Sequence, residues 1–497
     1  MSSTVNLFAL LAPWSGLDST LDRPVEGLTL DSRRVQPSWL FLAVAGSSRH
    51  GLAHLDEALA RGATAVAWEP APGFDPHAVQ DRCRAVGAVA VPVEGLAKTA
   101  GEIAARYHAH PSSALRVIGV TGTDGKTSVA HYAAQLADWL DGSSAIMGTL
   151  GWGDVTAPVE PGLTTADAVS VQTRLAELRN RHVRTVAMEV SSHALVQSRV
   201  EAVEFNVAVL TQVGRDHLDY HGTVEAYQAA KRRLFTHAGL GECVLNRDDG
   251  LGAELLSALD RTAPAISYGR HPDADLRIVG TAPQATGLRL DALFRGVERT
   301  LVLPLLGEFN ALNALAALGA FVAHYPLDEA LEGLARIRPV PGRMEYYRTP
   351  TDALAVIDYA HTPGALEAAL GALRRHLAGR LICVMGCGGD RDPGKRKLMG
   401  AAATGLADTV IVTDDNPRSE NPAKIRAEVR AGCHPGRDCR EIADREEAIA
   451  VAIAMAGPGD GVLVAGKGHE TEQIVGQTSH PFSDRAVVKS RAQGGMS

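Results

Sequence analysis

Aromatic residues are scarce in this chain of 497 residues, at 5% of the total, whereas glycine occurs 50 times. Small residues let helices pack closely against a sheet, so this balance is typical of α/β proteins. With 45% hydrophobic and 21% charged residues, the composition is that of an ordinary globular protein. The length predicts about two to four domains.

Paired cysteine motifs are also missing. The six cysteines stand at positions 83, 243, 383, 387, 433 and 439, without CxxC spacing. We therefore expect neither a zinc site nor a disulfide framework. His434 follows Cys433 directly, and we interpret this adjacency as coincidence.

Positive charge and long apolar runs are lacking too. The net charge of −8 excludes a typical nucleic-acid-binding protein, because no basic stripe offsets it. The short basic cluster at residues 391–397 is interpreted as a solvated loop, with a carboxylate or phosphate pocket as the alternative. No basic segment precedes the apolar stretch Leu7–Leu11, and no run is long enough to span a bilayer. We expect a cytoplasmic monomer without membrane insertion.

A glycine-rich loop is the most informative motif that is present. The apolar residues 117–120 lead into Thr121-Gly122-Thr123-Asp124-Gly125-Lys126-Thr127-Ser128, and a helical pattern begins near Val129. Glycines allow backbone N–H groups to approach phosphate oxygens, whose charge the helix N-terminus favours. Lys126 is placed to reach the terminal phosphates, and the Thr127 hydroxyl is a Mg²⁺ ligand of the usual kind. The sequence predicts binding of ATP or a close relative by a shortened Walker A loop, since position 120 is valine.

Strand-like runs followed by helical patterns predict an α/β fold with mainly parallel sheets. Before residue 111 we expect strands at 39–45, 63–68 and 86–91 and a helix at 97–107. A hinge is expected at residues 339–342, where two prolines and a glycine end any regular element.

Four apolar runs after the hinge each end in polar residues. The runs are 354–357, 381–385, 409–412 and 461–465. They lead into residues 358–363, 386–392, 414–418 and 466–470 respectively. Because ligands bind at the carboxyl ends of strands in open parallel sheets, we expect a binding face there.

Two further strands in the middle of the chain carry candidate metal ligands. The run 185–190 delivers Glu189, which is either a Mg²⁺ ligand or a structural acid. Residues 205–210 lead to His217 and His221, which have zinc-like i,i+4 spacing without a third ligand. Magnesium suits the phosphate loop better. Lys231 lies in an alanine-rich helix, where the default interpretation is a solvated basic face.

Together these residues resemble the Mur ligase family over nearly the whole chain. The pieces that carry the resemblance, in the family's order, are residues 122–127, 189–193, 216–222, 231, 307–313, 342–345 and 358–363. Within the family, Asp415-Asn416-Pro417-Arg418 is similar to the signature of the members that add 2,6-diaminopimelate, and residues 466–470 agree.

The resemblance implies a three-domain Mur ligase architecture. It has an N-terminal domain at 1–111 that binds the UDP precursor, a central P-loop mononucleotide-binding domain at 112–339 and a Rossmann-like, amino-acid-binding C-terminal domain at 340–497. The implied reaction is ATP-dependent ligation of meso-diaminopimelate to the D-glutamate of UDP-N-acetylmuramoyl-L-alanyl-D-glutamate, through an acyl phosphate, in peptidoglycan synthesis. Mg²⁺ is the implied cofactor, and ATP is a co-substrate.

The resemblance also assigns site residues by motif match. Catalysis falls to Lys126, Glu189, His217 and Lys231, and the metal ligands are Thr127, Glu189, His217 and Lys231 after carbamylation to N6-carboxylysine. The ATP-binding set is Gly122, Thr123, Asp124, Gly125, Lys126, Thr127, Ser128, Asn310, Arg343 and Asp358. The UDP-precursor set is Leu30, Ser32, Ser47, Ser48, Arg49, Thr164, Thr165, Ser191, Gln197 and Arg199. The diaminopimelate set is Arg391, Asp415, Asn416, Pro417, Arg418, Gly466 and Glu470.

Two positions depart from the family pattern. Asp124 stands where asparagine is usual, so it either weakens ATP binding or is offset by a nearby lysine or arginine. Leu163 stands where asparagine is common, and one precursor contact is then lost.

Two kinds of alternative stay open. The first is a sister ligase: one that adds lysine, one that adds D-alanyl-D-alanine, or a folylpolyglutamate synthase. The second is an ATP-binding regulatory module without ligase activity. Residues 415–418 discriminate against the first. The intact set of Lys126, Glu189, His217 and Lys231 argues against the second.

Overall fold

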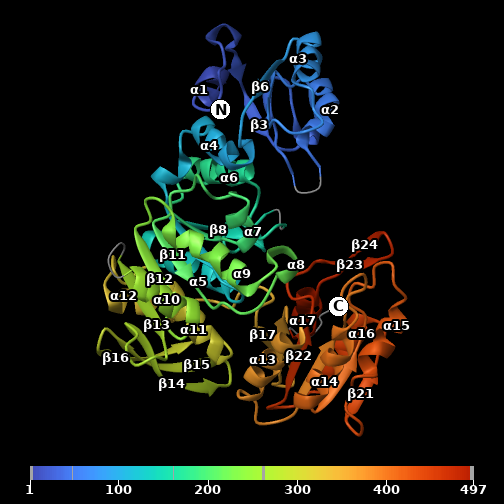
Figure 1. The fold of residues 1–497 in the computed structure, drawn as a ribbon. Coiled ribbons are helices and arrows are strands. Elements are labelled where there is room, and N and C mark those ends of the chain that lie inside the picture. Colours follow the sequence, from blue (N-terminus) through green and yellow to red (C-terminus); the bar gives the residue numbers. More distant parts are fainter. Residues whose placement is uncertain (1–3, 47–48, 160–161, 260–263, 493–497) are drawn as a thin grey trace. The chain divides into compact units, whose positions relative to one another are not determined.

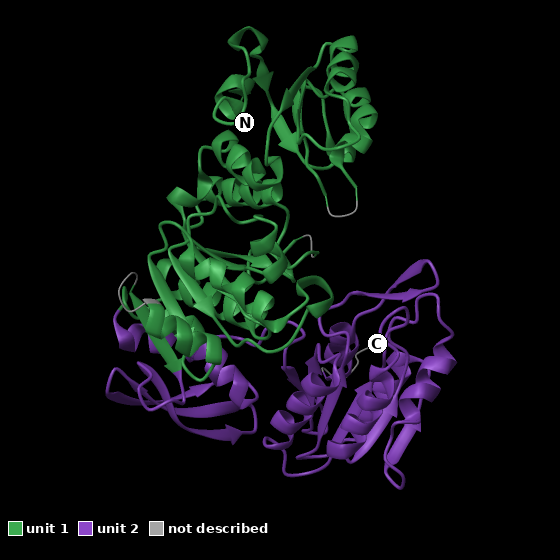
Figure 2. Ribbon diagram, in the orientation of Figure 1, with its two compact units in different colours: residues 1–268, 316–325 green, residues 269–315, 326–497 purple. Residues whose placement is uncertain are grey.

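The computed structural model describes residues 4–46, 49–159, 162–259 and 264–492 (Figure 1). The chain forms two compact units, one of Met1–Tyr268 with Ala316–Tyr325 and one of Gly269–Leu315 with Pro326–Ser497 (Figure 2). The domain limits at 111 and 339 divide the chain in another way and stay a prediction.

Unit 1 begins with a small parallel sheet in the order β3-β4-β5-β6. Its strands are β3 (Gly27–Thr29), β4 (Trp39–Ala43), β5 (Ala65–Trp68) and β6 (Val89–Pro92), and its helices are α2 (Leu55–Ala60), α3 (Pro76–Ala85) and α4 (Leu96–Tyr107). The expected strands and helix are therefore present, with ends shifted by at most three residues. The short strands β1 (Val5–Asn6) and β2 (Pro24–Val25) form an antiparallel pair, and α1 (Leu7–Leu11) buries three leucines.

The larger sheet of unit 1 has the strand order β13-β12-β11-β7-β10-β8-β9, and its strands are parallel except β9. The strands are β7 (Arg116–Thr121), β8 (Ser144–Gly148), β9 (Gly151–Gly153), β10 (Thr185–Glu189), β11 (Val207–Leu210), β12 (Glu242–Asn246) and β13 (Ala265–Gly269). The helices are α5 (Lys126–Asp141), α6 (Ala168–Asn180), α7 (Ser192–Val196), α8 (Leu218–His221), α9 (Val224–Arg232) and α10 (Gly250–Leu259). The central strand β7 lies between β10 and β11, so its carboxyl end is a switch point of the kind where ligands bind.

Unit 2 contains an antiparallel three-stranded segment and a second, mostly parallel sheet. The first comprises β14 (Leu276–Gln284), β15 (Gly287–Phe294) and β16 (Val297–Leu303). The second has the order β17-β18-β22-β19-β20-β21, with β17 (Glu345–Arg348) antiparallel to β18. Its other strands are β18 (Leu354–Asp358), β22 (Gly461–Ala465), β19 (Leu381–Met385), β20 (Thr409–Val412) and β21 (Asp438–Glu441).

Helices and one hairpin complete the elements. The helices are α11 (Glu308–Gly319), α12 (Leu327–Leu334), α13 (Pro363–Arg374), α14 (Lys395–Leu406), α15 (Pro422–Arg430), α16 (Arg445–Met455) and α17 (Asp484–Ala492). The hairpin pairs β23 (Glu472–Val475) with β24 (Thr478–Pro481), and single turns of 3₁₀ helix occur at Ser19–Leu21, Ser32–Arg34, Gly51–His54, Pro111–Ala114 and Arg233–Thr236. Throughout the described part of the chain, no helix has both the length and the apolar character needed to cross a bilayer.

The four strands expected after the hinge are confirmed. They could be recognised in the sequence because both faces of their sheet are buried. Alternate residues enter two separate cores: Leu381, Cys383 and Met385 of β19 lie in one, and Ile382 and Val384 lie in the other. A strand buried on both faces reads as a continuous apolar run, which is the pattern seen.

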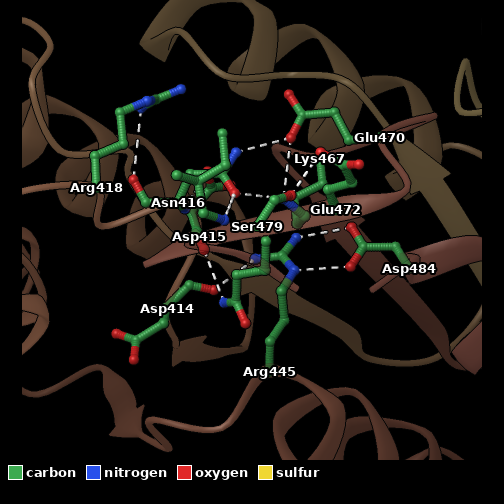
Figure 3. Close-up of polar contacts among 12 residues, drawn as sticks. Asp414, Asp415, Asn416, Arg418, Arg445, Lys467, Glu470, Glu472, Ser479 and Asp484 are labelled. Atoms are coloured by element: carbon green, nitrogen blue, oxygen red, sulfur yellow. Dashed lines mark hydrogen bonds and ion pairs between the residues drawn. The ribbon is translucent and has the colours of Figure 1, made fainter. Parts of the chain in front are cut away.

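A fully buried ion pair joins the first residues of α16 and α17, beside the carboxyl ends of the parallel strands of unit 2. Arg445, at the start of α16, donates from Nε to Asp484 Oδ1 at 2.7 Å and from Nη2 to Oδ2 at 2.8 Å (Figure 3). Both side chains have 0% exposure. Nη2 of Arg445 also donates to the carbonyl of Ala465, the last residue of β22, at 2.9 Å. The pair therefore connects α16, α17 and the end of β22.

Replacing this arginine tests the pair's contribution. We expect Arg445→Ala to destabilise unit 2 by about 3–5 kcal/mol, because Asp484 is left as an uncompensated buried charge. The exposed pair of Arg440 with Asp438 is the control, and Arg440→Ala is expected to cost far less, because water screens this pair. Urea unfolding followed by circular dichroism measures both, and equal losses would contradict the expectation.

Candidate active site

The phosphate loop of unit 1 lies between β7 and α5, at the switch point of the larger sheet. Gly122 and Gly125 have φ of 152° and 84°, values that favour glycine. A Cβ at Gly122 would lie 1.8 Å from Thr211 Oγ1, so a side chain there is excluded. Helix α5 begins at Lys126, three residues before the expected start. Lys126 Nζ folds back onto its own loop and donates to the carbonyls of Gly122 at 3.0 Å and Thr123 at 2.7 Å.

Asp124 points out of this loop and is exposed. Its Oδ2 accepts a hydrogen bond from Gln212 Nε2 at 2.9 Å. Two outcomes were expected for the Asp124 charge: it weakens ATP binding, or a nearby lysine or arginine offsets it. The hydrogen bond is made to a neutral amide, and the Asp124 charge also acts on the nearby Lys231 amine, whose pKa it raises.

Glu189 ends β10 and is buried, with 2% exposure. Its Oε2 accepts from Thr127 Oγ1 at 2.9 Å, which brings the two expected metal ligands together. Its Oε1 accepts from the backbone N–H of Thr149 at 2.8 Å, and the Thr149 hydroxyl reaches Oε2 at 3.3 Å. A Cβ at Gly148 would lie 2.2 Å from Oε1, so this glycine makes room for the carboxylate. Sequence reasoning missed Thr149, whose one signal is its place directly after β8.

Lys231 is buried, with 1% exposure, so the interpretation as a solvated basic face is wrong. Its Nζ donates to the Gly122 carbonyl at 2.6 Å and lies 4.3 Å from the centre of the Tyr227 ring. Burial and the nearby Lys126 ammonium together lower the pKa of Lys231 to about 6, against the opposing charges of Asp216 and Asp124. The amine is therefore placed beside the phosphate loop in a setting that disfavours its cationic form.

His217 occupies a different environment from the other predicted ligands. It is exposed, has a left-handed backbone with φ of 51°, and its ring lies 4.8 Å from that of His193. Its Nε2 is 3.4 Å from Asp216 Oδ2. His221 turns instead to Ser192 Oγ at 3.0 Å, so the i,i+4 spacing does not place both rings on one ligand. Within the described ranges, no group of three or more His, Cys, Asp or Glu is arranged to hold a metal ion.

Most residues of the expected precursor set in the middle of unit 1 lie next to Glu189. Thr165 Oγ1 donates to the Glu189 carbonyl at 2.8 Å and accepts from the Ser191 N–H at 3.0 Å. Arg199 Nη1 donates to the Thr165 carbonyl at 2.8 Å, and its Nη2 donates to Gln197 Oε1 at 2.6 Å. Thr164 joins the group through the Thr149 hydroxyl at 3.1 Å. Leu163 is exposed and belongs to none of these contacts.

Three of the remaining precursor residues, Leu30, Ser32 and Arg49, lie in segments that connect the strands of the small N-terminal sheet. Leu30 and Ser32 line a pocket of about 380 Å³, in which Ser32 Oγ donates to Glu57 Oε2 at 2.7 Å. Arg49 is exposed. Ser47 and Ser48 lie outside the described residues.

Two of the expected nucleotide residues of unit 2, Asn310 and Asp358, are held by backbone contacts. Asn310 is buried, and its Nδ2 donates to the Leu306 carbonyl at 2.8 Å. Arg343 lies over the Tyr359 ring, 4.4 Å from its centre. Asp358 accepts from the N–H groups of Met344 at 2.8 Å and Ala360 at 2.9 Å. Burial raises the pKa of Asp358, and the Arg343 charge opposes the rise.

The loops after β20 and β22 meet through a closed ring of hydrogen bonds (Figure 3). Lys467 Nζ donates to Asn416 Oδ1 and to Glu470 Oε2, each at 2.9 Å, and Asn416 Nδ2 donates to the same Glu470 oxygen at 2.9 Å. Lys467 has 0% exposure, and sequence reasoning did not single it out. The sequence feature that could have identified Lys467 is its position inside the recognised motif at residues 466–470. Asp415 completes this turn, because its Oδ1 accepts from the Asn416 N–H at 2.7 Å, and a Cβ at Gly466 would lie 3.0 Å from its Oδ2.

Arg418 and Arg391 border the same glycine. A Cβ at Gly388 would lie 2.8 Å from Arg418 Nη1 and 3.9 Å from Arg391 Cγ. Arg418 has a left-handed backbone, and its Nη1 donates to the Gly389 carbonyl at 2.8 Å. Arg391 is exposed, as a solvated loop requires, but the neighbouring Arg396 is not. Arg396 is 1% exposed and pairs with Glu420 at 2.8 Å and Glu428 at 2.7 Å, so the solvated interpretation of the basic cluster is wrong there.

Comparison with protein families covers most of the chain. The models described as "Mur ligase family, catalytic domain", "Mur ligase middle domain" and "Mur ligase, glutamate ligase domain" match residues 24–108, 120–321 and 342–468. A UDP-N-acetylmuramoyl-L-alanyl-D-glutamate–2,6-diaminopimelate ligase from Alkalilimnicola ehrlichii is 49% identical over 97% of this chain and 98% of its own. The chain belongs to the Mur ligase family.

Two further Mur ligases agree. The ligase of the same name from Pseudomonas aeruginosa is 45% identical over 93% of this chain and 94% of its own. A solved structure of a UDP-N-acetylmuramoyl-L-alanyl-D-glutamate–2,6-diaminopimelate ligase is 34% identical, with a TM-score of 0.72 over 99% of each chain. The expected fold class, an α/β Mur ligase of three domains, is confirmed.

Proposed function

We propose that this Mur ligase joins meso-2,6-diaminopimelate to the D-glutamate of UDP-N-acetylmuramoyl-L-alanyl-D-glutamate, with cleavage of ATP to ADP and phosphate. The observation that carries the proposal is the meeting of residues 415–418 with residues 466–470 around Lys467 in unit 2. The names of relatives 43–49% identical support it. We further propose that the enzyme works as a monomer in the cytoplasm, in peptidoglycan synthesis, with domains at 1–111, 112–339 and 340–497.

The chemistry follows from the poor reactivity of a carboxylate. Phosphorylation of the glutamate γ-carboxylate by ATP gives an acyl phosphate, and an amine of diaminopimelate attacks its carbonyl carbon as phosphate leaves. The phosphate loop supplies N–H groups and Lys126 to stabilise charge on the transferring group, the contribution that is usually largest in such sites. Thr165, Ser191, Gln197 and Arg199 hold the precursor next to Glu189 in this proposal.

The donor set beside the loop suits magnesium. The Thr127 hydroxyl and the Glu189 carboxylate are hard oxygen donors already in contact at 2.9 Å, and His217 with a carbamylated Lys231 completes the proposed ligands. Bound Mg²⁺ supplies positive charge that offsets the phosphates. Lys231 is held beside Gly122 with its cationic form disfavoured, and addition of CO₂ to the neutral amine gives the anion that this position requires.

Substrate-dependent phosphate release tests the function. With ATP and UDP-N-acetylmuramoyl-L-alanyl-D-glutamate present, we expect release that depends on meso-diaminopimelate and is small with L-lysine. A preference for lysine would keep the ligase and overturn the amino-acid assignment. Release without the precursor would indicate the regulatory ATP-binding module, and no release with either amino acid would indicate a sister ligase.

Removing the Lys231 amine tests the carbamate. We expect Lys231→Ala to lose activity by about 10²-fold or more, as for loss of a group that stabilises transferring charge, and added short carboxylates to restore part of it. Wild-type protein labelled with ¹³C-bicarbonate should show a carbamate resonance that the variant lacks. Full activity of Lys231→Ala would contradict the role, as would wild-type activity that bicarbonate removal leaves unchanged.

Asp124→Asn tests the charge in the phosphate loop. We expect the KM for ATP to fall about five-fold, because ~1 kcal/mol of repulsion between solvated charges about 4 Å apart is removed. The asparagine Oδ1 still accepts from Gln212, so loop geometry is retained. Asp138→Asn, an exposed change in the last turns of α5, is the control and should leave this KM unchanged. A higher KM for Asp124→Asn would contradict the electrostatic account.

Arg418→Ala tests amino-acid selectivity. Among the described residues, the Arg418 guanidinium donates its hydrogen bonds from Nη1, to the carbonyls of Gly389 and Asn416. Its Nε and Nη2 take no part in these two bonds. Such a fork pairs with the carboxylate that lysine lacks. We expect the preference for diaminopimelate over lysine to drop by ~10²-fold or more, from the ~3 kcal/mol typical of a charged pair. Arg348→Ala, in the exposed pair with Asp352, is the control, and unchanged discrimination in Arg418→Ala would overturn the role.

A further inference from the structure

Two cysteines that the sequence leaves six residues apart are brought into direct contact. Cys433 follows the C-terminal end of α15, and Cys439 lies in β21. The chain between them turns at Gly436, which has φ of 80°. The two Sγ atoms are 2.6 Å apart, close to the ~2.05 Å of a disulfide bond. All six cysteines are free thiols in the structure, and these two sulfurs need to approach by only ~0.5 Å to reach bonding distance. The expectation that the chain has no disulfide framework stays a prediction.

This pair differs from the other cysteines in its access to solvent. Strand β21 is at the edge of its sheet, residues 434–438 are exposed, and both cysteines are half-buried. The other four, at positions 83, 243, 383 and 387, are buried. Burial raises the pKa of Cys83 and Cys387 to about 11 and that of Cys243 and Cys383 to about 12. Oxidants select thiols that are exposed and ionised, so the pair at β21 is the accessible target.

The two sulfurs are not equivalent. The contact with Cys433, together with the Arg430 guanidinium, lowers the pKa of Cys439 to about 7. The same contact raises the pKa of Cys433. Arg430 is fixed at this place because its Nη1 donates to Glu441 Oε2 at 3.0 Å. Cys439, beside the Arg430 guanidinium, is therefore the sulfur that ionises more readily.

We infer that Cys433 and Cys439 form a dithiol that a hydroperoxide oxidises to an intramolecular disulfide, with Cys439 reacting first. The Cys439 thiolate attacks one peroxide oxygen, the O–O bond breaks, and a sulfenic acid and hydroxide (or alkoxide) result. Cys433 then attacks the Cys439 sulfur, its proton goes to the departing hydroxyl as water, and the S–S bond forms. Two electrons pass from the sulfurs to the peroxide. This modification site is independent of the ligase activity proposed above.

Tryptic digestion gives a direct readout, because cleavage after Arg430, Arg437 and Arg440 separates the two cysteines. The full chain is treated with hydrogen peroxide, alkylated and digested. We expect peptides 431–437 and 438–440 joined, with a mass two hydrogens below their sum, and separated by dithiothreitol. The peptide 381–391, which carries both Cys383 and Cys387, should be alkylated at both thiols in the same sample. Recovery of 431–437 and 438–440 as separate alkylated peptides at excess peroxide would overturn the proposal.

Two variants test the order of reaction. In Cys433→Ser the sulfenic acid at Cys439 has no resolving thiol, so it should persist and react with dimedone. We expect this labelling to be about ten-fold stronger than the labelling of Cys433 in Cys439→Ser, because oxidants prefer thiolates. Equal labelling of the two variants, or stronger labelling of Cys433, would overturn the assigned roles. The wild-type digest needs no variant to fold and decides the disulfide by itself.

Discussion

The cost of burying charge shapes both candidate binding regions of this chain. Lys467 and Arg445 in unit 2 and Glu189 in unit 1 are all buried at the carboxyl ends of parallel strands, and each is matched by partners fixed in the fold. Lys467 is shared between an amide oxygen and a carboxylate, Arg445 forms a two-bond pair, and Glu189 accepts from threonine donors. Groups held in this way have one position, because moving any of them leaves a buried charge unsatisfied. Exposed residues such as Arg391 lie in loops next to these buried, fixed groups.

Close approach of backbone and side chains is the second constraint on the same edges. Gly122, Gly148 and Gly466 stand where a Cβ would meet Thr211, Glu189 and Asp415. Each glycine lies in or next to a loop that leaves a strand end, so the sheet's register brings chemically active groups within contact distance of neighbouring backbone. Preorganisation of this kind is what lets fixed donors act on a charge that develops during reaction.

Much of the fold was visible in the sequence because its causes are local. The doubly buried strands of unit 2 read as apolar runs, and the loops after them were recognised from their polar residues. Partners distant in sequence were not visible. Lys231 is buried because α9 packs on a loop more than a hundred residues earlier, and Arg396 because Glu420 and Glu428 come from other segments. Thr149 and the contact between Cys433 and Cys439 were missed for the same reason, since strand neighbours and turn geometry decide them.

The two carboxylates beside the phosphate loop show how environment decides the effect of a departure from a family pattern. Glu189 is buried and surrounded by donors, so its charge acts at one place with little screening. Asp124 is exposed and hydrogen-bonded to a neutral amide, so water screens its charge. A charge introduced at the buried position would need a new partner in the fold. At position 124 it needs none, because the side chain is exposed and the loop's glycines, Lys126 and Thr127 keep their arrangement beside it. The fold of the phosphate loop therefore tolerates a carboxylate at this position.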